Sequence, residues 1–389
     1  MRKSYFAIIA LGALVIASCQ KENSADLPKV DSPVFTATLD TGSDTKTELV
    51  ERDGKKKSEW VSGDAIRVLN GTNIKGCDAV YTTTDEGASA TFKTDVKDFT
   101  GTEFVAMYPA SPAGSAWWNK ESPEYVNKLY LNPVQAATVG TYDPNAHIAV
   151  AHSENTSLAF INAVSLLKFT VASDNVSEVC IYPNTSTDYV AGNFNIAVTG
   201  EHVGTITKER GKSDGWTNDS YVKATGTFEK GNTYYIACLP TTFTTGFTVE
   251  VVSNNIKGDN KTTKKNYELK RNTILDLGNV EYKKTLYLKP NDNWNKDGAW
   301  FAAYFFGDSN TWVEMEKVGD TGYYKVVAPD VTKYPKVVFC RMNPTSVDFS
   351  WDEGKKWNQT GDLTIGDENC YTITDGEWDK SGSWSVYGE

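Results

Sequence analysis

The segment Phe247-Thr-Val-Glu-Val251 decides the fold of this chain, because apolar side chains alternate in it with polar ones. Successive side chains of a β-strand point to opposite faces of a sheet, so the alternation predicts a strand with one buried face. The same pattern occurs in Phe35-Thr-Ala-Thr-Leu39, Ala65-Ile-Arg-Val-Leu69 and Lys168-Phe-Thr-Val171, and turn residues separate these segments. Many short strands with turns between them predict an all-β chain built of β-sandwiches.

The length and composition of the chain indicate three such units. Its 389 residues exceed what one ordinary core holds, and we expect β-sandwiches at residues 32–154, 155–284 and 285–389. The boundary after Lys284 is the clearest, because seven of the eleven tryptophans follow it. Tryptophan at that density exceeds the needs of one small core, so we expect some of these rings to be exposed. The net charge of −11 includes no basic patch, which argues against nucleic acid as a partner.

The first residues have the layout of a secretory signal. Arg2 and Lys3 precede a mostly apolar run that ends in Ile16-Ala17-Ser18-Cys19. A cysteine at the cleavage point resembles the bacterial lipoprotein signal, which implies cleavage after residue 18 and lipid attachment at Cys19. Residues 19–31 are polar and read as a tether. We therefore expect a protein held to the outer membrane by its N-terminal lipid and exposed at the cell surface.

Residues 32–282 carry a series of short segments whose order and spacing matter more than any one of them. They are Phe35-Thr-Ala-Thr, Thr45-Lys-Thr47, Trp60-Val-Ser-Gly-Asp64, Ala106-Met-Tyr108-Pro109, Leu131-Asn-Pro-Val-Gln135, Leu158-Ala-Phe160, Leu166-Leu-Lys-Phe169, Val190-Ala-Gly192, Tyr234-Tyr-Ile-Ala-Cys-Leu-Pro240 and Leu275-Asp-Leu-Gly278. This order resembles the fimbrillin-like lipoproteins of Bacteroidetes, which implies two tandem transthyretin-like β-sandwiches. Some members of that family are pilus subunits that polymerise by strand donation. Here a further unit occupies the C-terminus, where a polymerising subunit would keep its donor strand, so a tip component or a stand-alone surface protein fits better.

The third unit contains a strand with aromatic side chains on both faces, Trp300-Phe-Ala-Ala-Tyr304-Phe-Phe306. Trp300, Ala302, Tyr304 and Phe306 share one face, and the phenylalanines at 301 and 305 share the other. A small sandwich cannot bury both faces unless both are covered. One face of this strand is therefore a candidate binding platform.

The segments that follow this strand form a recognisable series. They are Trp312, Gly322-Tyr-Tyr-Lys-Val-Val, Lys336-Val-Val-Phe-Cys-Arg-Met-Asn343 and Gln359-Thr-Gly-Asp-Leu363. Their order resembles the starch-binding carbohydrate-binding modules of families twenty-five and twenty-six. The resemblance implies a β-sandwich that binds α-glucan on aromatic rings, since flat rings stack against the C–H face of a sugar.

Carried over residue by residue, the resemblance makes Tyr304 and Trp312 the first candidates for stacking, with Trp300 next. Gln359 and Asn358 are the candidate polar contacts, because amides bond sugar hydroxyls. Ala302 stands where the family usually has a second ring, so either Trp300 substitutes for that ring or the ligand is not starch. Burial of Tyr304 and Trp312 in a core is the alternative.

The remaining tryptophans of the third unit and the cysteines favour plainer interpretations. Trp351, Trp378 and Trp384 are interpreted as core or surface residues. Cys77, Cys180, Cys238, Cys340 and Cys370 form no Cys-x-x-Cys pair. Each is interpreted as a small buried apolar residue rather than half of a disulfide.

Nothing in the sequence indicates an enzyme. Of the three histidines, His147 and His152 are the only neighbours, and no third metal ligand is identifiable. Nucleophile, phosphate-loop and zinc-helix motifs are missing from the sequence, no pair of carboxylates stands apart from the others, and no cofactor is expected. Acidic turns such as Asp375-Gly-Glu-Trp-Asp379 are explained by turn chemistry better than by Ca²⁺ binding.

Two functions therefore remain open for this chain. The first is non-catalytic capture of a polysaccharide, with α-glucan as the suspected ligand. The second is a fimbrial tip or accessory subunit, an adhesin whose third unit docks a protein partner or a host glycan. Rings flanked by amides favour a glycan, whereas a broad apolar patch or an open sheet edge favours a protein partner.

Overall fold

The computed structural model describes residues 31–39, 50–52, 55–57, 59–70, 78–110, 117–118, 124–208, 220–378 and 381–388. These residues form strands and two single turns of 3-10 helix, η1 (Pro144–Ala146) and η2 (Lys296–Gly298). The all-β prediction is therefore confirmed for the described part of the chain. Among the described residues, none of the helices has the length and apolar character that a bilayer span requires.

The first part of the chain forms a seven-stranded sheet in the order β5-β4-β7-β11-β12-β1-β6. Trp60 is fully buried against it and makes edge-on ring contacts with Phe92, Tyr108 and Phe160 at centroid distances of 4.9, 5.3 and 5.5 Å. Trp60 is thus an anchor of this core. The strands are β1 (Phe35–Leu39), β4 (Ala65–Asn70), β5 (Asp78–Thr82), β6 (Ser89–Phe92), β7 (Phe104–Tyr108), β11 (Ala149–Ser153) and β12 (Ser157–Asn162), with a separate hairpin of β2 (Val50–Arg52) and β3 (Lys55–Lys57).

In the second part, the described strands form four sheets around the largest of the cores that the structure describes. The sheet orders are β10-β17-β14-β20-β21 with β22 beside β20, β18-β13-β24, β16-β15-β9-β8, and β19-β23. The strands are β8 (Trp117–Trp118), β9 (Tyr125–Leu131), β10 (Val134–Ala136), β13 (Ser165–Val171), β14 (Val176–Pro183), β15 (Gly192–Ala197), β16 (Ile206–Lys208), β17 (Val222–Thr225), β18 (Thr233–Cys238), β19 (Thr241–Phe243), β20 (Phe247–Ser253), β21 (Ile256–Lys257), β22 (Lys261–Thr262), β23 (Tyr267–Leu269) and β24 (Ile274–Val280).

Strand pairing does not change at the expected boundary between residues 154 and 155. β12 lies after this boundary but pairs in parallel with β1 of the first sheet, from Thr36–Ser157 to Leu39–Phe160. β9 and β10 lie before it but pair with β15 and β17 of the second part. β7 turns alternate residues into the two cores, with Val105 and Met107 in the larger one. The first two parts are therefore interlocked rather than joined end to end.

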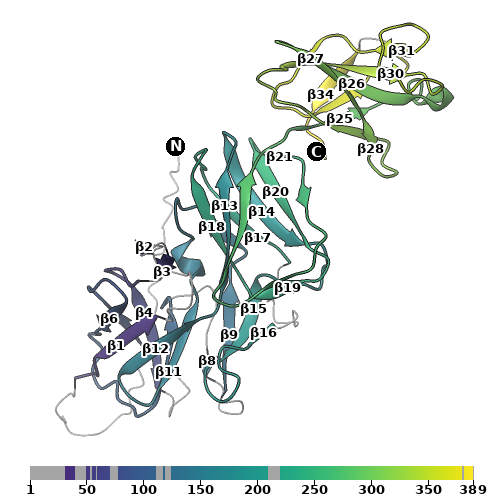
Figure 1. Cartoon of the computed structure of the whole chain (residues 1–389). Helices are drawn as coiled ribbons and strands as arrows, with labels where there is room; N and C mark the ends of the chain where they lie inside the picture. The colour runs from purple at the N-terminus through teal and green to yellow at the C-terminus, as the bar shows by residue number, and fades with distance from the viewer. Residues whose placement is uncertain are drawn as a thin grey trace, which may run out of the picture.

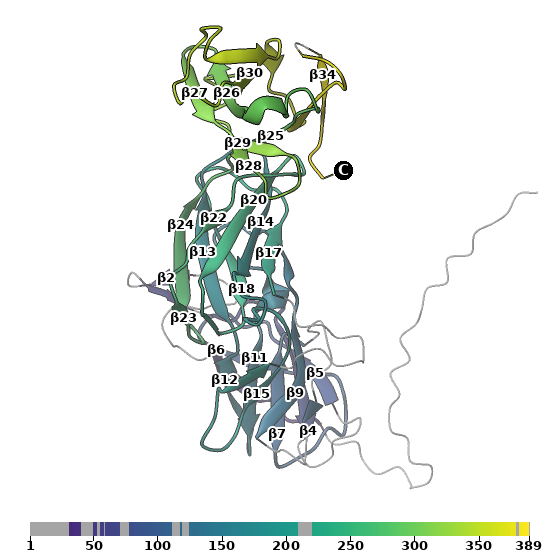
Figure 2. The ribbon, with the colours of Figure 1, turned by 90° about the vertical axis from the view of Figure 1, so that its right-hand side faces the viewer.

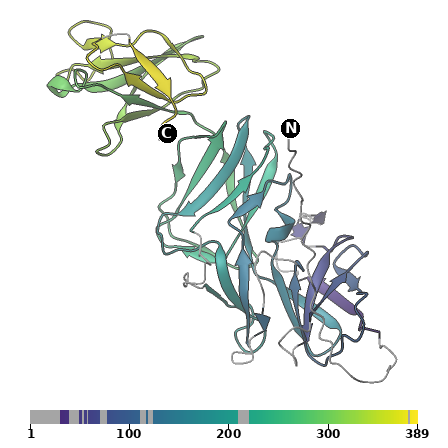
Figure 3. The same ribbon diagram turned by 180° about the vertical axis from the view of Figure 1, so that it is seen from behind.

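The third part is a sandwich of two five-stranded sheets, drawn in light green and yellow at one end of the molecule (Figures 1 and 2). Figure 3 shows it from behind, at the opposite end from the first sheet. Its sheet orders are β28-β29-β25-β33-β34 and β27-β26-β30-β31, with β32 beside β30. The strands are β25 (Thr285–Lys289), β26 (Trp300–Phe306), β27 (Asn310–Glu314), β28 (Glu316–Lys317), β29 (Tyr324–Val327), β30 (Lys336–Met342), β31 (Lys356–Gln359), β32 (Leu363–Thr364), β33 (Cys370–Ile373) and β34 (Gly382–Ser385).

Candidate functional site

The two faces of β26 have different surroundings in the structure. Phe301, Ala303 and Phe305 are buried in the core between the two sheets. Trp300, Tyr304 and Phe306 are half-buried on the outer face of the same strand, around the small buried side chain of Ala302. The predicted division of this strand is therefore confirmed, and its outer face carries the candidate site.

Tyr304 and Trp312 are direct neighbours across the pair of strands β26 and β27. Their ring centroids lie 4.9 Å apart and the ring planes are inclined by 55°. Phe306, two residues along β26, stacks on Tyr304 at 5.7 Å. Because residues opposite each other in antiparallel strands lie within contact distance, the two candidates for stacking form one surface.

The loop of residues 343–355, between β30 and β31, adds two rings to this surface. Trp351 contacts Tyr304 at a centroid distance of 4.8 Å and Trp312 at 4.7 Å. Phe349 lies 5.8 Å from both Trp312 and Trp300, on the part of the face where Ala302 provides no ring. We call these rings the aromatic cluster: Trp300, Tyr304, Phe306, Trp312, Phe349 and Trp351.

Trp300 holds the loop in place. Its indole Nε1 donates hydrogen bonds to the carbonyl oxygens of Asn343 and Ser346, both at 3.0 Å. Buried indole N–H groups usually find such acceptors, and here the acceptors lie at the start of the loop. The structure thus gives Trp300 a positioning role, because it fixes the segment that carries Phe349 and Trp351.

The predicted amide contacts lie on opposite sides of the sheet. Gln359 is opposite Cys340, which faces the aromatic cluster, and its Oε1 accepts a hydrogen bond of 2.7 Å from Lys356 Nζ. Asn358 is opposite Arg341 and accepts a hydrogen bond of 3.4 Å from its Nη1, on the face turned away from the cluster. Gln359 therefore lies on the same face of the sheet as Tyr304 and Trp312, and Asn358 lies on the other face.

The exposed part of the aromatic cluster comes from the loop, which the sequence interpretation did not single out. Trp351 is 43 % exposed and Phe349 is 41 % exposed, whereas Tyr304 and Trp312 are less exposed and count as half-buried. Lys356 Nζ lies 5.7 Å from the Trp351 ring centroid and completes the rim with Gln359. The sequence did contain a pattern that could have indicated this loop, because Val347, Phe349 and Trp351 alternate with polar residues.

This arrangement suits recognition of a ligand with an apolar face and hydroxyl groups. Indole and phenol rings offer a flat electron-rich surface, and the Gln359 amide with the Lys356 ammonium offers hydrogen bonds at its edge. Cys340 lies beneath the rings, and burial raises the pKa of its thiol to about 12, so it contributes as an apolar residue.

The described histidines, and the described cysteines other than Cys340, take no part in this site. Cys19 and Cys77 lie outside the described residues. Cys180, Cys238, Cys340 and Cys370 are free and buried, as expected. His147 is buried beside the rings of Tyr108 and Tyr142, and His152 pairs with Glu103 at 2.9 Å. No group of three or more potential metal ligands occurs in the part of the chain that the structure describes.

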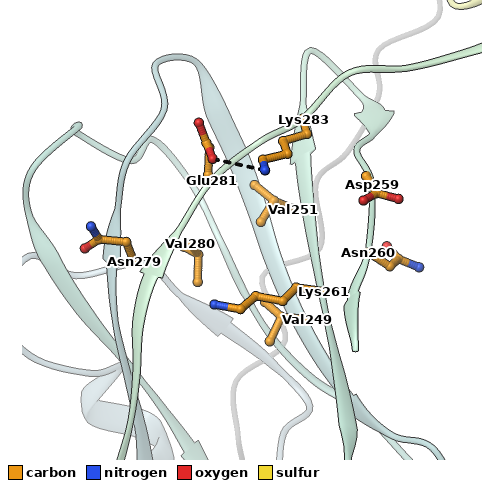
Figure 4. A pocket seen from close by; sticks show the side chains of 9 residues that line it. All are labelled: Val249, Val251, Asp259, Asn260, Lys261, Asn279, Val280, Glu281 and Lys283. Atoms are coloured by element: carbon orange, nitrogen blue, oxygen red, sulfur yellow. Dashed lines mark ion pairs between the residues drawn. The ribbon is translucent and has the colours of Figure 1, made fainter. Parts of the chain in front are cut away.

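Two adjoining pockets of about 380 and 280 Å³ open on the second part of the molecule, between β20, β22 and β24. The larger is lined by Val249, Val251 and Val280, with charged side chains beside them, as Figure 4 shows. Two of these charges, Glu281 and Lys283, pair at 3.7 Å. The larger pocket has no aromatic lining, and none of the predicted site residues lines either pocket.

Comparisons with known proteins find matches among solved structures. No protein-family model and no curated protein matches the sequence. The fold is similar to a candidate cell adhesion protein from Bacteroides ovatus, at 13 % identity and a TM-score of 0.38, over 77 % of this chain and 100 % of that one. A fimbrial protein from the same species matches at 12 % identity and a TM-score of 0.30, over 80 % and 57 %. A candidate polysaccharide-binding protein from Bacteroides thetaiotaomicron matches at 8 % identity and a TM-score of 0.29, over 64 % and 91 %.

Proposed function

We propose that this protein is a lipid-anchored, non-catalytic glycan-binding protein of the bacterial outer surface, with its binding site on the aromatic cluster of residues 285–389. One observation carries the proposal. Trp351 is 43 % exposed on top of Tyr304 and Trp312, and Gln359 and Lys356 lie at the edge of the same surface. Rings bordered by hydrogen-bonding groups are the usual way in which proteins bind sugars without cleaving them.

The ligand that we propose is an α-glucan. The segments that resemble starch-binding modules supply Tyr304, Trp312 and Gln359, and these three residues lie on one face. The planes of Trp312 and Trp351 are inclined by 52°. A curved chain such as an α-1,4-glucan can contact rings at such an inclination in turn, whereas a flat β-1,4-glucan requires nearly coplanar rings.

The rest of the chain supports display rather than binding in this proposal. Lipidation at Cys19 would fix the N-terminus to the membrane, and residues 19–31 would act as the tether. The interlocked first two parts then serve as a stalk, with the third part at the far end from the first sheet (Figure 1).

Calorimetric titration of the full-length protein with soluble starch and with β-glucan tests this function. We expect binding of starch in the micromolar to millimolar range, about −4 to −8 kcal/mol. Trp351→Ala removes one stacked ring, worth about 1 kcal/mol, and should weaken binding roughly fivefold to tenfold. Tyr267→Ala, in an exposed aromatic of the second part, is the matched control and should leave the affinity unchanged. Unchanged affinity in Trp351→Ala, or binding of β-glucan alone, would refute the assignment.

A second function has one observation in its favour. Val347, at the tip of the same loop, is 89 % exposed, and an aliphatic side chain offers nothing for sugar stacking. Together with Phe349 and Trp351 it makes an apolar patch that a protein partner could cover. In an adhesin of this kind, Val347→Asp would abolish binding to the partner protein. In a glycan-binding protein it would leave starch binding intact.

A further inference from the structure

A second group of aromatic and polar side chains lies on the opposite face of the sheet from the aromatic cluster. Its centre is Arg341, which is only 3 % exposed. The guanidinium carbon lies 4.6 Å from the ring centroid of Trp357 and 5.5 Å from that of Trp378. An arginine against two indoles is a stable arrangement, because the planar cation is attracted to aromatic faces.

Hydrogen bonds fix the guanidinium in this position. Nε donates to the carbonyl oxygen of Trp294 at 2.9 Å, and Nη2 donates to the carbonyl oxygen of Lys296 at 2.6 Å and to Asp297 Oδ2 at 2.8 Å. Trp294 is itself fully buried and stacks on Phe301 in the core. Arg341 is therefore a rigid support for whatever lies against it.

Trp378 is supported by this arrangement and still reaches solvent. Its carbonyl oxygen accepts a hydrogen bond of 2.8 Å from Trp294 Nε1, while the residue as a whole is 41 % exposed. An exposed indole that is held from beneath loses little conformational entropy when a ligand stacks on it, which favours binding. Trp378 thus has the properties expected of a pre-positioned stacking residue.

Polar groups of the kind that bond sugar hydroxyls lie beside Arg341 or beside the Trp378 ring. The Asp297 side chain is 64 % exposed and uses Oδ2 for Arg341. Asn358, the amide that lies away from the aromatic cluster, is on this face beside Arg341. Lys296 Nζ lies 5.6 Å from the Trp378 ring. A ring, an amide and an ammonium occur here as in the first site, and Asp297 adds a carboxylate that the first site does not have.

We propose that Trp378, Asp297 and Asn358 form a second carbohydrate-binding site, for a neutral pyranose. Neutrality is argued from the charges, because Asp297 offsets Arg341, and the two carboxylates that precede Trp378 in the chain, Asp375 and Glu377, outnumber the remaining cation, Lys296. An acidic sugar would be repelled there. The site goes beyond the proposed function, since two separate sites let one domain hold two chains, or two parts of one chain, at once.

The test uses 19F NMR of the full-length protein labelled with 5-fluorotryptophan. The Trp378 resonance is assigned from its loss in Trp378→Phe, and the Trp351 resonance from its loss in Trp351→Ala. The protein is titrated with maltoheptaose, with mannohexaose and with an oligogalacturonate of similar length. We expect the Trp378 resonance to shift with a neutral oligosaccharide and to shift equally in the Trp351→Ala protein, where the first site is damaged.

The outcomes separate the two sites. A Trp378 shift that vanishes in Trp351→Ala would show that the signal comes from the first site, and would overturn the proposal. A Trp378 resonance that stays unmoved by both neutral oligosaccharides, or that moves only with the oligogalacturonate, would overturn it as well. A Trp378 shift without any Trp351 shift would support the second site and count against the first. The titrations follow the native ring, and the Trp378→Phe protein is needed only to assign its resonance.

Discussion

Replacement of Arg341 tests how much the contacts of its buried guanidinium contribute to the stability of the third part. In Arg341→Met, the apolar stem of the side chain keeps its volume while the guanidinium is lost. The carbonyl oxygens of Trp294 and Lys296 then lose their donor, and the rings of Trp357 and Trp378 lose the cation between them. The substitution therefore removes several interactions that share one group.

The size of the effect follows from which of these interactions are buried. Hydrogen bonds from a charged donor contribute about 1.5–3 kcal/mol each, and a desolvated cation–π contact contributes up to about 2 kcal/mol. The ion pair with Asp297 adds little, because that carboxylate is 64 % exposed and screened by solvent. Since these contributions are not additive, we expect Arg341→Met to lower the free energy of unfolding by about 3–5 kcal/mol.

Urea denaturation followed by tryptophan fluorescence measures this change, because seven of the eleven tryptophans lie in the third part. Asp297→Asn is the control. Asn tolerates the positive φ of 62° at this position, and we expect a loss below about 1 kcal/mol. A loss below about 1 kcal/mol in Arg341→Met, or an equal loss in both variants, would refute the view that the buried carbonyl contacts dominate.

Three further predictions concern the loop, one histidine and the cysteines. Trp300→Phe keeps a ring but removes the hydrogen-bond donor to the carbonyl oxygens of Asn343 and Ser346, so the loop should be held less firmly and trypsin should cut after Lys355 or Lys356 faster than in the native protein. Equal cleavage rates would show that Trp300 does not anchor the loop. Burial lowers the pKa of His147 from 6.5 to about 3, so the folded state binds this proton more weakly than the unfolded state does. Stability should therefore be fully present above pH 6.5 and fall as the pH drops from 6.5 towards 3. In His147→Phe, denaturant midpoints at pH 7.5 and 5 should differ less than in the native protein, and an unchanged difference would exclude His147 as the cause. Burial raises the pKa of the Cys180, Cys238 and Cys340 thiols to about 12. Iodoacetamide at pH 8 should therefore leave these cysteines unmodified in the native protein and alkylate them in the denatured protein, as measured by peptide mass spectrometry.

Local patterns in the sequence were sufficient for the candidate strand and its principal rings. The alternation in residues 300–306 separates the core face from the outer face, and the turn after Phe306 brings Trp312 opposite Tyr304. The same rule should have separated Asn358 from Gln359, because adjacent residues of one strand point to opposite faces. The bulge opposite Arg341 and Met342 leaves this alternation intact at residues 358 and 359.

Features that depend on contacts between distant segments were not predictable in this way. The position of Trp351 follows from the path of a loop, and the anchor of that loop is a side chain some 50 residues earlier in the chain, Trp300. The pairing of β12 with β1 joins residues separated by about 120 positions. Periodicity in one segment carries no information about such partners.

The interlocking of the first two parts has a mechanical consequence for a protein held at one end. Successive described strands pass from one part to the other three times, between β7 and β8, β10 and β11, and β12 and β13. The third part is joined by a single passage near Lys284, with one bridge to Gly258. A pulling force along the chain therefore meets several hydrogen-bonded strand pairs between the first two parts, and a single connection near Lys284 between the second part and the third. In the lipid-anchored protein that we propose, this single connection would let the third part turn towards a ligand while the first two parts stay folded.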